Sequence, residues 1–379
     1  MSQANGNSEL RVGILGSGGI SNVHANGWNA QAGKARIAAF ADVAVDRARA
    51  QSEKHTGGAA KVYGSLDELL ADPEIDVVDI CLPHHLHTDA IIASAEAGKA
   101  VLCEKPLCTN LDDARRIKET LDRTGIVFMA AHNQLFQPSL IEARRLVATG
   151  VMGTPYIFRS IETFQHRSFN PHAVGGAAAA GDLMGWRADL RQSGGGELLD
   201  TGYHSTYRLL ALANNDRPME VTGFLSRFLM SHLPTEDTGQ VVVRFASGAI
   251  GEILTSWAFD VAGARHFEIM AENGALAGAP TYLQHHLFKW PQPQQRAFEP
   301  IATFTAEIGH FIDVVKNGAD NPATIDVAAR ALQLIKGAYL SAQTGQTVTL
   351  PEDPTAAPTP RVTAAETPFS VAVPDEVLA

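Results

Sequence analysis

The chain has 379 residues, 45% of them hydrophobic and 19% charged, which suffices for two globular domains with buried cores. The formal net charge of −11 argues against binding to nucleic acid or to an anionic membrane surface, because both need a basic face. Three cysteines without a CxxC pair exclude a disulfide framework and favour a reducing, cytoplasmic environment. The first residues lack the apolar core of a signal peptide, and no apolar run is long enough to span a membrane.

Residues 1–133 alternate short apolar strands with amphipathic helices, a pattern typical of a doubly wound parallel sheet in an α/β fold. The expected strands are apolar on both faces, as in a sheet covered by helices on both sides. They are Leu10–Leu15, Arg36–Ala41, Val77–Leu82, Ala100–Cys103 and Ile126–Ala131. The expected helices are Ile20–Ala32, Asp46–His55, His87–Ala97 and Leu111–Thr124.

Residues 134–350 have longer segments of mixed polarity, which predict an α+β domain with an open, mostly antiparallel sheet. The expected strands are Pro155–Gln165, Val221–Met230, Gln240–Ala246 and Ala249–Phe259, with a hairpin turn at Ser247-Gly248. The expected helices are Glu197–Ala213, Thr305–Lys316 and Ile325–Ala342. The segment 166–181 is rich in Gly and Ala and is expected to be a loop, either covering a substrate or simply exposed. Residues 351–379 are expected to be a loosely held tail.

A glycine-rich turn follows the first strand and opens the first helix. Gly16 permits the tight turn, and Gly18 lets a pyrophosphate approach the free N–H groups at the helix start. The residues of this turn expected to contact a cofactor are Gly16, Gly18, Gly19 and Ile20. Asp42 ends the next strand, where a carboxylate accepts from the ribose 2′-hydroxyl of NAD and repels the 2′-phosphate of NADP. Arg47 lies close by at the adenosine end, so NAD is expected and NADP is less favoured.

Two further groups of charged residues fall where chemistry is expected. Glu104 and Lys105 follow the expected strand Ala100–Cys103, at the sheet edge where ligands bind. Asp200 and His204 are four residues apart, so one helix face would carry both, with the carboxylate orienting the imidazole. Taken alone, Glu104 and Lys105 are more typical of a surface ion pair, and Asp200 and His204 of a helix-surface pair without a role. The histidines His84, His85 and His87 stand too close together to converge on one ion, so no metal site is predicted.

The motifs together resemble the glucose–fructose oxidoreductase, inositol dehydrogenase and rhizopine-catabolism (Gfo/Idh/MocA) family over about residues 10 to 350. The segments that carry the resemblance are GSGGIS (16–21), SLDELLADPEIDVVDICLPHHLHTDAIIASAEAGKAVLCEKP (65–106), GGGELLDTGYH (194–204), IATFTAEIGHFIDVVKNG (301–318) and TIDVAARALQLIKGAYLSAQTG (324–345). The resemblance implies an NAD(P)-binding Rossmann domain followed by a substrate-binding and oligomerisation domain.

The resemblance also implies roles for individual residues. The family's catalytic positions correspond to Lys105, Asp200 and His204. Its cofactor-binding positions add Leu82, Pro83, His84, His87, Glu104, Lys105 and Asn133 to the residues of the glycine turn. The residues expected to bind substrate are Lys105, Trp186, Arg187, Asp200 and His204, with Trp186 and Arg187 equally suited to anchoring a domain interface. Two positions depart from the family pattern: Tyr207 replaces a frequent Asp, and Asn133 starts a segment that often holds a basic residue.

The implied reaction is the oxidation of a secondary hydroxyl on a sugar, glycoside or cyclitol. His204 would remove the hydroxyl proton, Lys105 would stabilise the alkoxide, and hydride would pass to NAD. Two alternatives remain open: an NAD-dependent glycosidase that oxidises its substrate transiently, and a non-catalytic cofactor-sensing regulator. The exposed face of the second sheet needs a cover, so we expect a homodimer or homotetramer.

Overall fold

The computed structural model describes residues 9–165, 185–231, 233–261 and 265–360. The segment 166–181, expected to be a loop, lies outside these ranges. In the described part, no helix is long and apolar enough to cross a membrane.

The N-terminal half forms the predicted parallel sheet, which has six strands rather than the five expected, in the order β3-β2-β1-β4-β5-β6. The strands are β1 (Leu10–Leu15), β2 (Ala35–Ala41), β3 (Lys61–Tyr63), β4 (Val77–Ile80), β5 (Ala100–Glu104) and β6 (Phe128–Ala131). The connecting helices are α1 (Gly19–Asn29), α2 (Val45–Thr56), α3 (Leu66–Ala71), α4 (His87–Glu96) and α5 (Leu111–Thr124). The central strands are buried on both faces, which explains their continuous apolar sequence. The strand order reverses between β1 and β4, which is where such sheets bind ligands.

The short strand β3 and helix α3 were not predicted. Strand β3 is an edge strand of three residues and only half-buried, so its pattern is too short to stand out. Helix α3 does have a sequence signal: the Ser65 side chain accepts from the Glu68 N–H at 3.2 Å, and a Glu68 carboxylate oxygen accepts from the Gly64 N–H at 2.7 Å. This is nearly the reciprocal arrangement of a capping box, S-x-x-E.

The C-terminal half forms a sheet of ten strands in the order β14-β13-β12-β11-β7-β10-β9-β8-β15-β16. The strands are β7 (Pro155–Thr163), β8 (Pro218–Ser226), β9 (Thr238–Phe245), β10 (Ile250–Ser256), β11 (Phe267–Ala271), β12 (Gly274–Ala279), β13 (Tyr282–Leu287), β14 (Gln294–Ala297), β15 (Val348–Thr349) and β16 (Thr359–Pro360). Only β7 and β10 pair in parallel, so the sheet is mostly antiparallel as predicted. The hairpin turn at Ser247-Gly248 joins β9 to β10, with Gly248 at φ +90°. Strands β11 to β14 were not predicted.

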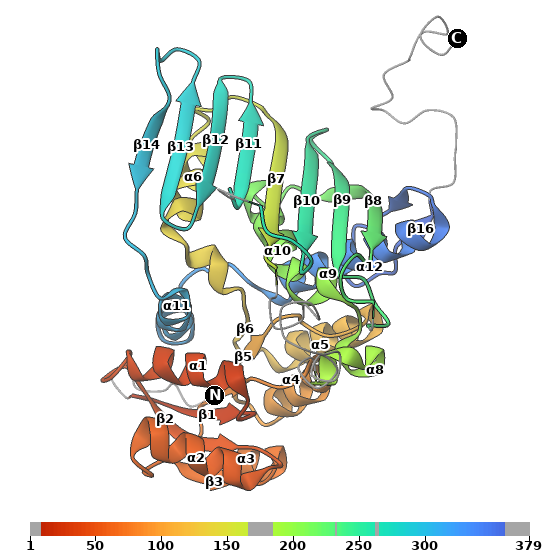
Figure 1. Ribbon diagram of the computed structural model, residues 1–379. Helices are drawn as coiled ribbons and strands as arrows, with labels where there is room; N and C mark the ends of the chain where they lie inside the picture. Colours follow the sequence, from red (N-terminus) through yellow and green to blue (C-terminus); the bar gives the residue numbers. More distant parts are fainter. Residues whose placement is uncertain (1–8, 166–184, 232, 262–264, 361–379) are drawn as a thin grey trace, which may run out of the picture.

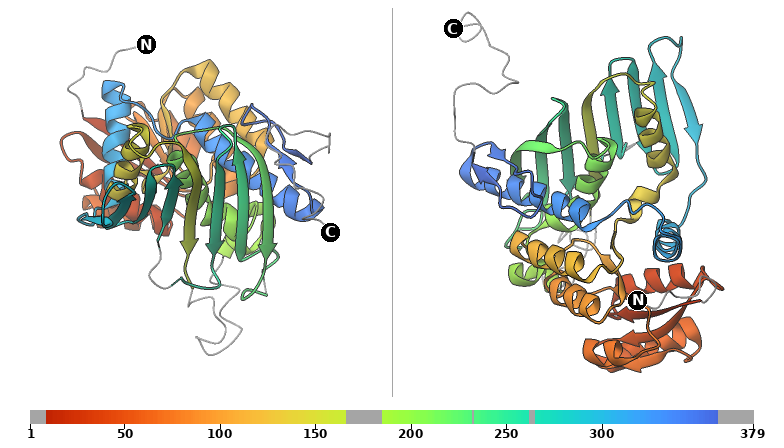
Figure 2. Two further views of the ribbon diagram at one scale, coloured as in Figure 1. Left: turned by 90° about the horizontal axis from the view of Figure 1, so that it is seen from above. Right: turned by 180° about the vertical axis from the view of Figure 1, so that it is seen from behind.

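Helices cover one face of this larger sheet, as the view from behind in Figure 2 shows. These helices are α6 (Pro138–Ala148), α10 (Gly202–Leu212) and α12 (Ile325–Thr344). Helix α11 (Thr303–Asn317) instead returns to the first half and packs on α1 (Figure 1). The site described below therefore lies where segments from both halves of the chain meet.

The remaining helical segments are short. They are the 3₁₀ turns η1 (His84–Leu86), η2 (Asn133–Phe136) and η4 (Gly185–Ala188) and the helices α8 (Leu190–Ser193) and α9 (Glu197–Asp200). The prediction of a single helix Glu197–Ala213 is wrong, because the helix is interrupted at Thr201 and forms two helices, α9 and α10. The Trp257 indole donates to the Thr201 hydroxyl at 2.8 Å at this break.

The start of the expected tail is anchored. The side chain of Gln333 on α12 donates to the carbonyls of Asp353 at 2.7 Å and Ala356 at 2.8 Å, and β16 pairs with β15. The expectation of a loose segment is therefore corrected for residues 351–360. Residues 361–379 lie outside the described ranges.

Candidate active site

A cavity of about 440 Å³ opens at the carboxyl edge of the parallel sheet, beside the point where the strand order reverses. Most of the residues predicted to bind a cofactor line this cavity. Trp186 and Arg187, which were predicted to bind substrate, line it as well. The lining residues are Gly16, Ser17, Gly18, Gly19, Ile20, Asp42, Arg47, Cys81, Leu82, Pro83, His84, Glu104, Lys105, Trp186 and Arg187.

The glycine turn forms one wall of the cavity. Gly16 has φ +92°, and a Cβ on it would lie 2.4 Å from the Cys81 carbonyl oxygen, so glycine is required there. A Cβ on Gly18 or Gly19 would meet nothing within 4 Å, which leaves the backbone open to a ligand at the start of α1. The buried Ser17 hydroxyl has no hydrogen-bond partner among the described residues. An open backbone at a helix N-terminus beside an unpartnered hydroxyl fits the diphosphate of a dinucleotide.

Asp42 lies beside the glycine turn in a fixed orientation. Its two carboxylate oxygens accept from the backbone N–H groups of Ser17 and Ala44, each at 2.7 Å. Because each carboxylate oxygen can accept more than one hydrogen bond, the group can still receive a ribose hydroxyl. Arg47 lines the cavity nearby, as expected.

A buried chain of hydrogen bonds supports the end of β5. The two ring nitrogens of His24 lie 2.9 Å from carboxylate oxygens of Asp79 and Glu104, and the Trp28 indole donates to Asp79 at 2.7 Å. Burial opposes a charge on His24, but the Asp79 carboxylate raises the pKa of His24 well above its ordinary value. The second oxygen of Glu104 accepts from the Lys105 N–H at 2.9 Å, which fixes the backbone of that lysine.

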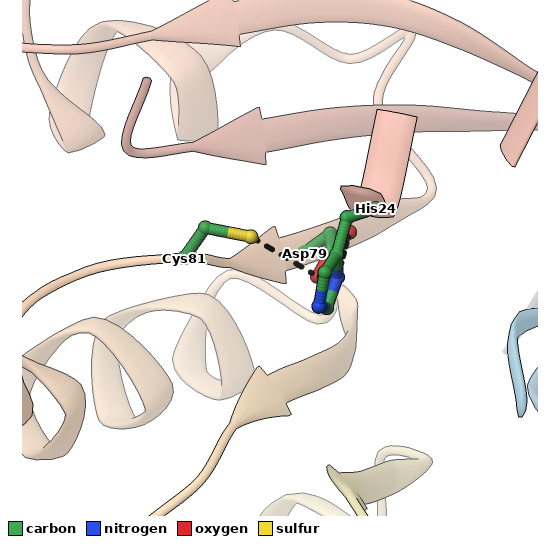
Figure 3. A group of neighbouring side chains, drawn as sticks. All are labelled: His24, Asp79 and Cys81. Atoms are coloured by element: carbon green, nitrogen blue, oxygen red, sulfur yellow. Dashed lines mark hydrogen bonds and ion pairs between the residues drawn. The ribbon is translucent and has the colours of Figure 1, made fainter. Parts of the chain in front are cut away.

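His24, Asp79 and Cys81 also lie close enough together to be considered as metal ligands (Figure 3). However, both ring nitrogens of His24 face carboxylate oxygens at 2.9 Å, so both donate and neither has a free lone pair. Burial raises the pKa of the Cys81 thiol to about 12. The group is therefore better described as a charged hydrogen-bond network than as a metal site.

Lys105 and Asp200 meet at the inner end of the cavity. The Lys105 ammonium donates to the carbonyl oxygen and to one carboxylate oxygen of Asp200, each at 2.9 Å. Its third N–H has no partner within the described ranges. The other carboxylate oxygen of Asp200 accepts from Arg187. Burial opposes ionisation of Asp200, but Lys105 and Arg187 lower its pKa well below the ordinary value, so it stays charged.

His204 does not contact Asp200, and the prediction that this carboxylate orients the imidazole is wrong. The helix is interrupted at Thr201, although Thr201 keeps helical dihedral angles (φ −80°, ψ −39°). Lys105 donates to both the carbonyl and the carboxylate of Asp200, and the His204 N–H donates to the Thr201 carbonyl at 3.0 Å. Instead, Nδ1 of His204 lies 2.6 Å from the Tyr207 hydroxyl. Burial and the nearby Lys105 ammonium lower the pKa of His204 to about 4, so the ring is neutral at neutral pH.

Two of the predicted cofactor contacts lie behind the cavity wall. His87 is fully buried, with its ring nitrogens 2.8 Å from the Pro106 carbonyl and 2.9 Å from the Leu82 carbonyl. Asn133 donates to the Thr303 hydroxyl at 3.0 Å and lies beneath Tyr207. Neither is among the residues that line the cavity.

His84, Trp186 and Arg187 form one stack at the cavity wall. The ring of His84 lies 4.4 Å from that of Trp186 in an edge-on contact, and the Arg187 guanidinium lies 4.3 Å from the Trp186 ring. Burial lowers the pKa of His84 to about 3. Because Arg187 also binds Asp200, the stack joins the cofactor cavity to the lysine.

Sequence reasoning missed a buried polar cluster beneath His204. The Arg208 side chain is fully buried and donates to Ser160 at 3.0 Å and to the carboxylate of Glu162 at 2.9 Å. It also donates to the side chain of Gln134. Arg208 is the one Asp, Glu, Lys or Arg in the helix Gly202–Leu212, and that is the signal that could have found this cluster.

Comparisons with known proteins agree with this geometry. The model for the oxidoreductase family with an NAD-binding Rossmann fold matches residues 10–132, and the model for the GFO/IDH/MocA C-terminal domain matches residues 140–277. A 1,5-anhydro-D-fructose reductase of Ensifer adhaerens is 31% identical over 221 residues, 58% of this chain and 62% of the relative. A myo-inositol 2-dehydrogenase of Thermotoga maritima is 29% identical over 247 residues, 64% of this chain and 67% of the relative.

A solved levoglucosan dehydrogenase in complex with NADH has a TM-score of 0.80 at 21% identity, and the match covers 91% of this chain and all of that one. This structural match shows the shared fold. The match covers less than two thirds of the length of the 1,5-anhydro-D-fructose reductase, so the activity of that relative is not assigned to this chain. The two family models together span most of the chain, on both sides of the segment that follows β6. The chain therefore belongs to the GFO/IDH/MocA family of oxidoreductases, with an NAD-binding Rossmann fold in its first half.

Proposed function

We propose that the chain oxidises a secondary hydroxyl of a sugar, glycoside or cyclitol, with NAD as the hydride acceptor. Membership of the family makes it an NAD(P)-dependent oxidoreductase of the sugar and cyclitol class. The observation that supports the finer proposal is the arrangement of Lys105. Asp200 fixes the Lys105 ammonium and leaves one of its N–H groups without a partner among the described residues. The ammonium is also close enough to His204 to lower the pKa of that imidazole.

The two side chains have complementary tasks. His204 is neutral at neutral pH, so its free ring nitrogen can accept the hydroxyl proton of a bound alcohol. The third N–H of Lys105 can donate to the substrate oxygen on which negative charge develops. This interaction is stronger where water is partly excluded from the site. When bound, the nicotinamide ring supplies the two-electron acceptor for the carbon-bound hydrogen.

Asp200 has a different role from the one expected. It holds Lys105 through two hydrogen bonds and lies between two cations, Lys105 and Arg187. We infer that Asp200 keeps the ammonium from bonding elsewhere and directs its remaining N–H toward the substrate. Removal of this carboxylate would leave the Lys105 ammonium with one hydrogen bond, to the backbone carbonyl of residue 200, so the donor that faces the substrate oxygen would be less firmly fixed.

Asp42 favours NAD over NADP in this proposal. Its carboxylate is held by two backbone N–H groups and lines the cavity, so a 2′-phosphate there would meet a fixed negative charge. Arg47 also lines the cavity, and its positive charge is the feature among the described lining residues near Asp42 that would favour the 2′-phosphate of NADP.

The test is a panel of monosaccharides, glycosides and inositols assayed with NAD and NADP for reduced nicotinamide. Accumulation of NADH supports the dehydrogenase, whereas release of free sugar without net NADH would indicate the glycosidase alternative. For the substrate that responds, Lys105→Ala and His204→Gln should bind NAD normally and lose about 10²–10⁴ in kcat. Lys289→Ala and His286→Asn, at the far end of the larger sheet, serve as matched controls. Full activity of either active-site variant would refute the assigned role.

We also propose that the chain is a homodimer or homotetramer. The face of the larger sheet away from α12 exposes three apolar side chains on neighbouring strands: Phe224 is 67% exposed, Val242 39% and Ile250 38%. Burial of such side chains against a second copy would remove apolar area from water. Light scattering at micromolar concentration tests this, and a monomer would contradict it. Phe224→Glu should weaken the assembly.

A further inference from the structure

Tyr207 stands where the family pattern often has an aspartate, three residues after His204 on the same helix. Its side chain is buried, and its hydroxyl lies 2.6 Å from Nδ1 of His204. Within the described ranges, this is the hydrogen bond that the imidazole makes. The proposed function assigns proton removal to His204 but leaves open what orients it, since Asp200 is committed to Lys105.

We propose that Tyr207 is the positioning residue for His204: its hydroxyl receives the Nδ1–H and thereby leaves the lone pair of Nε2 free to accept the substrate proton. This inference rests on the proposed function of His204 as base. It assigns to a neutral phenol the task that a carboxylate performs in other histidine-based sites.

The hydrogen-bond count around the phenol supports this direction. A tyrosine hydroxyl has one proton to donate and two lone pairs with which to accept. The Gln134 N–H donates to it at 3.3 Å, and its own proton can go to the Asn133 side-chain oxygen at 3.4 Å. The Asn133 amide is oriented by its own donation to the Thr303 hydroxyl at 3.0 Å. The remaining lone pair of the phenol oxygen is then available for Nδ1–H of His204.

The partners of Tyr207 also connect the two halves of the chain. Gln134 and Asn133 belong to η2, which directly follows the last strand of the parallel sheet, whereas His204 belongs to a helix on the larger sheet. Tyr207 therefore fixes His204 relative to the parallel sheet, in which strand β5, next to β6, ends one residue before Lys105. Such a link keeps the His204 imidazole and the Lys105 ammonium at a fixed position relative to each other, so that both can act at one substrate carbon.

The ring of Tyr207 is held as firmly as its hydroxyl. The His132 ring lies parallel to it, with ring centres 4.2 Å apart and planes 6° apart. His132 is fully buried, and burial lowers its pKa to about 3, so the stacking ring is neutral. Burial raises the pKa of Tyr207 well above its ordinary value, so the phenol keeps its proton throughout the neutral range.

Charges of both signs face His204 from the surrounding elements. Lys105, at the end of β5, and Arg208, on the same helix, lower its pKa, whereas Glu162 on β7 and Glu104 on β5 raise it. Tyr207 adds no charge to this balance. A neutral partner therefore orients the base without making it a stronger base, in contrast to a carboxylate.

The experiment uses two phenylalanine variants on one helix. Tyr207→Phe removes the hydroxyl that faces His204, and Tyr203→Phe is the matched control, because Tyr203 is also fully buried but donates to the Ala328 carbonyl at 2.8 Å. For Tyr207→Phe we expect kcat to fall about 10–10²-fold with KM within about twofold and NAD affinity unchanged. For Tyr203→Phe we expect a lower melting temperature with kcat within about twofold. Equal kcat losses in the two variants, or none in Tyr207→Phe, would overturn the proposal.

A second measurement separates this inference from the proposed function. Long-range ¹H–¹⁵N correlation spectra of histidine-labelled protein report which ring nitrogen of His204 carries the proton, without any substrate. The His204→Gln variant assigns the signal. We expect the Nδ1–H tautomer in the natural protein and a shift toward Nε2–H in Tyr207→Phe. An Nε2–H tautomer in the natural protein would overturn the positioning role even if the enzyme is active. If the expected tautomer is found in a protein without dehydrogenase activity, the positioning role of Tyr207 is supported and the proposed dehydrogenase function is refuted.

Discussion

Asp79 anchors the buried hydrogen-bond network behind Lys105, the lysine proposed to act in the reaction, and its replacement by asparagine is the sharpest test of that network. Asp79 is fully buried and accepts from His24 and from Trp28. The change keeps the size of the side chain but removes the charge that faces the imidazolium. His24 would then retain only Glu104 as a charged partner.

The expected cost is large because the pair is out of water. Removal of one partner of a buried ion pair destabilises a protein by about 3–5 kcal/mol. The pKa of His24 is raised in the folded chain, so its stabilisation is fully present below the unfolded value of about 6.5 and is lost as the pH rises through the folded pKa. In Asp79→Asn the folded pKa of His24 falls. The difference between the two proteins should therefore be greatest at about pH 6 and shrink by up to about 1.4 kcal/mol per pH unit above that.

The assay is urea unfolding followed by tryptophan fluorescence, at about pH 6 and about pH 8.5. Asp76→Asn is the matched control: Asp76 binds Arg11 at 2.8 Å, but both side chains are about one-third exposed, so we expect a cost of only about 0–1 kcal/mol with little change between these pH values. The reasoning would be refuted if Asp79→Asn cost no more than Asp76→Asn, or if its cost were the same at both pH values.

Three further predictions concern the cofactor, the triple glycine and the base. Asp42→Ser should raise kcat/KM with NADP relative to NAD by about tenfold or more, because the fixed negative charge is removed; an unchanged ratio in steady-state assays would contradict this. Gly196→Ala should lower the stability by about 1–3 kcal/mol, because its Cβ would lie 2.4 Å from the Glu236 carbonyl oxygen, whereas Gly309→Ala should be nearly neutral in thermal unfolding, because its Cβ would meet only the flexible end of Gln31. The acid limb of kcat/KM should follow the pKa of His204, about 4, with activity lost as the pH falls through it; a limb near pH 6.5 would contradict the neutral environment described for this ring.

The parallel sheet could be predicted because its strands carry their burial in the sequence. Strands such as Val77–Ile80 are apolar throughout, and Gly16 and Asp42 lie at fixed distances from them. Strands β11 and β12 could not be recognised in this way, because they are short and one is built of Gly and Ala. A turn signal was nevertheless present, since Asn273-Gly274 is a dipeptide typical of hairpins.

The chemistry of the site was harder to predict than its location. Lys105 and His204 were found by their positions, but their partners were not. The spacing of Asp200 and His204 suggested one helix face, and that inference assumed an unbroken helix. The helix is interrupted at Thr201, and Asp200 accepts from Lys105 through both its carbonyl and its carboxylate. Contacts of this kind depend on tertiary packing, in particular on the Trp257 indole that binds Thr201, and no local pattern contains them.

Charges of alternating sign lead from the core to the cavity, and this order explains how so many ionised groups can be buried together. The groups along this path are Asp79, His24, Glu104, Lys105, Asp200 and Arg187. Each contacts a group of opposite charge or accepts from its neighbour's backbone, so the loss of hydration is offset at every step. At the cavity end of this path, one N–H of Lys105 has no protein partner among the described residues, and the same is true of one ring nitrogen of the nearby His204. An alcohol bound between them would meet a fixed donor and a neutral acceptor, which are the two groups that proton removal from a hydroxyl requires.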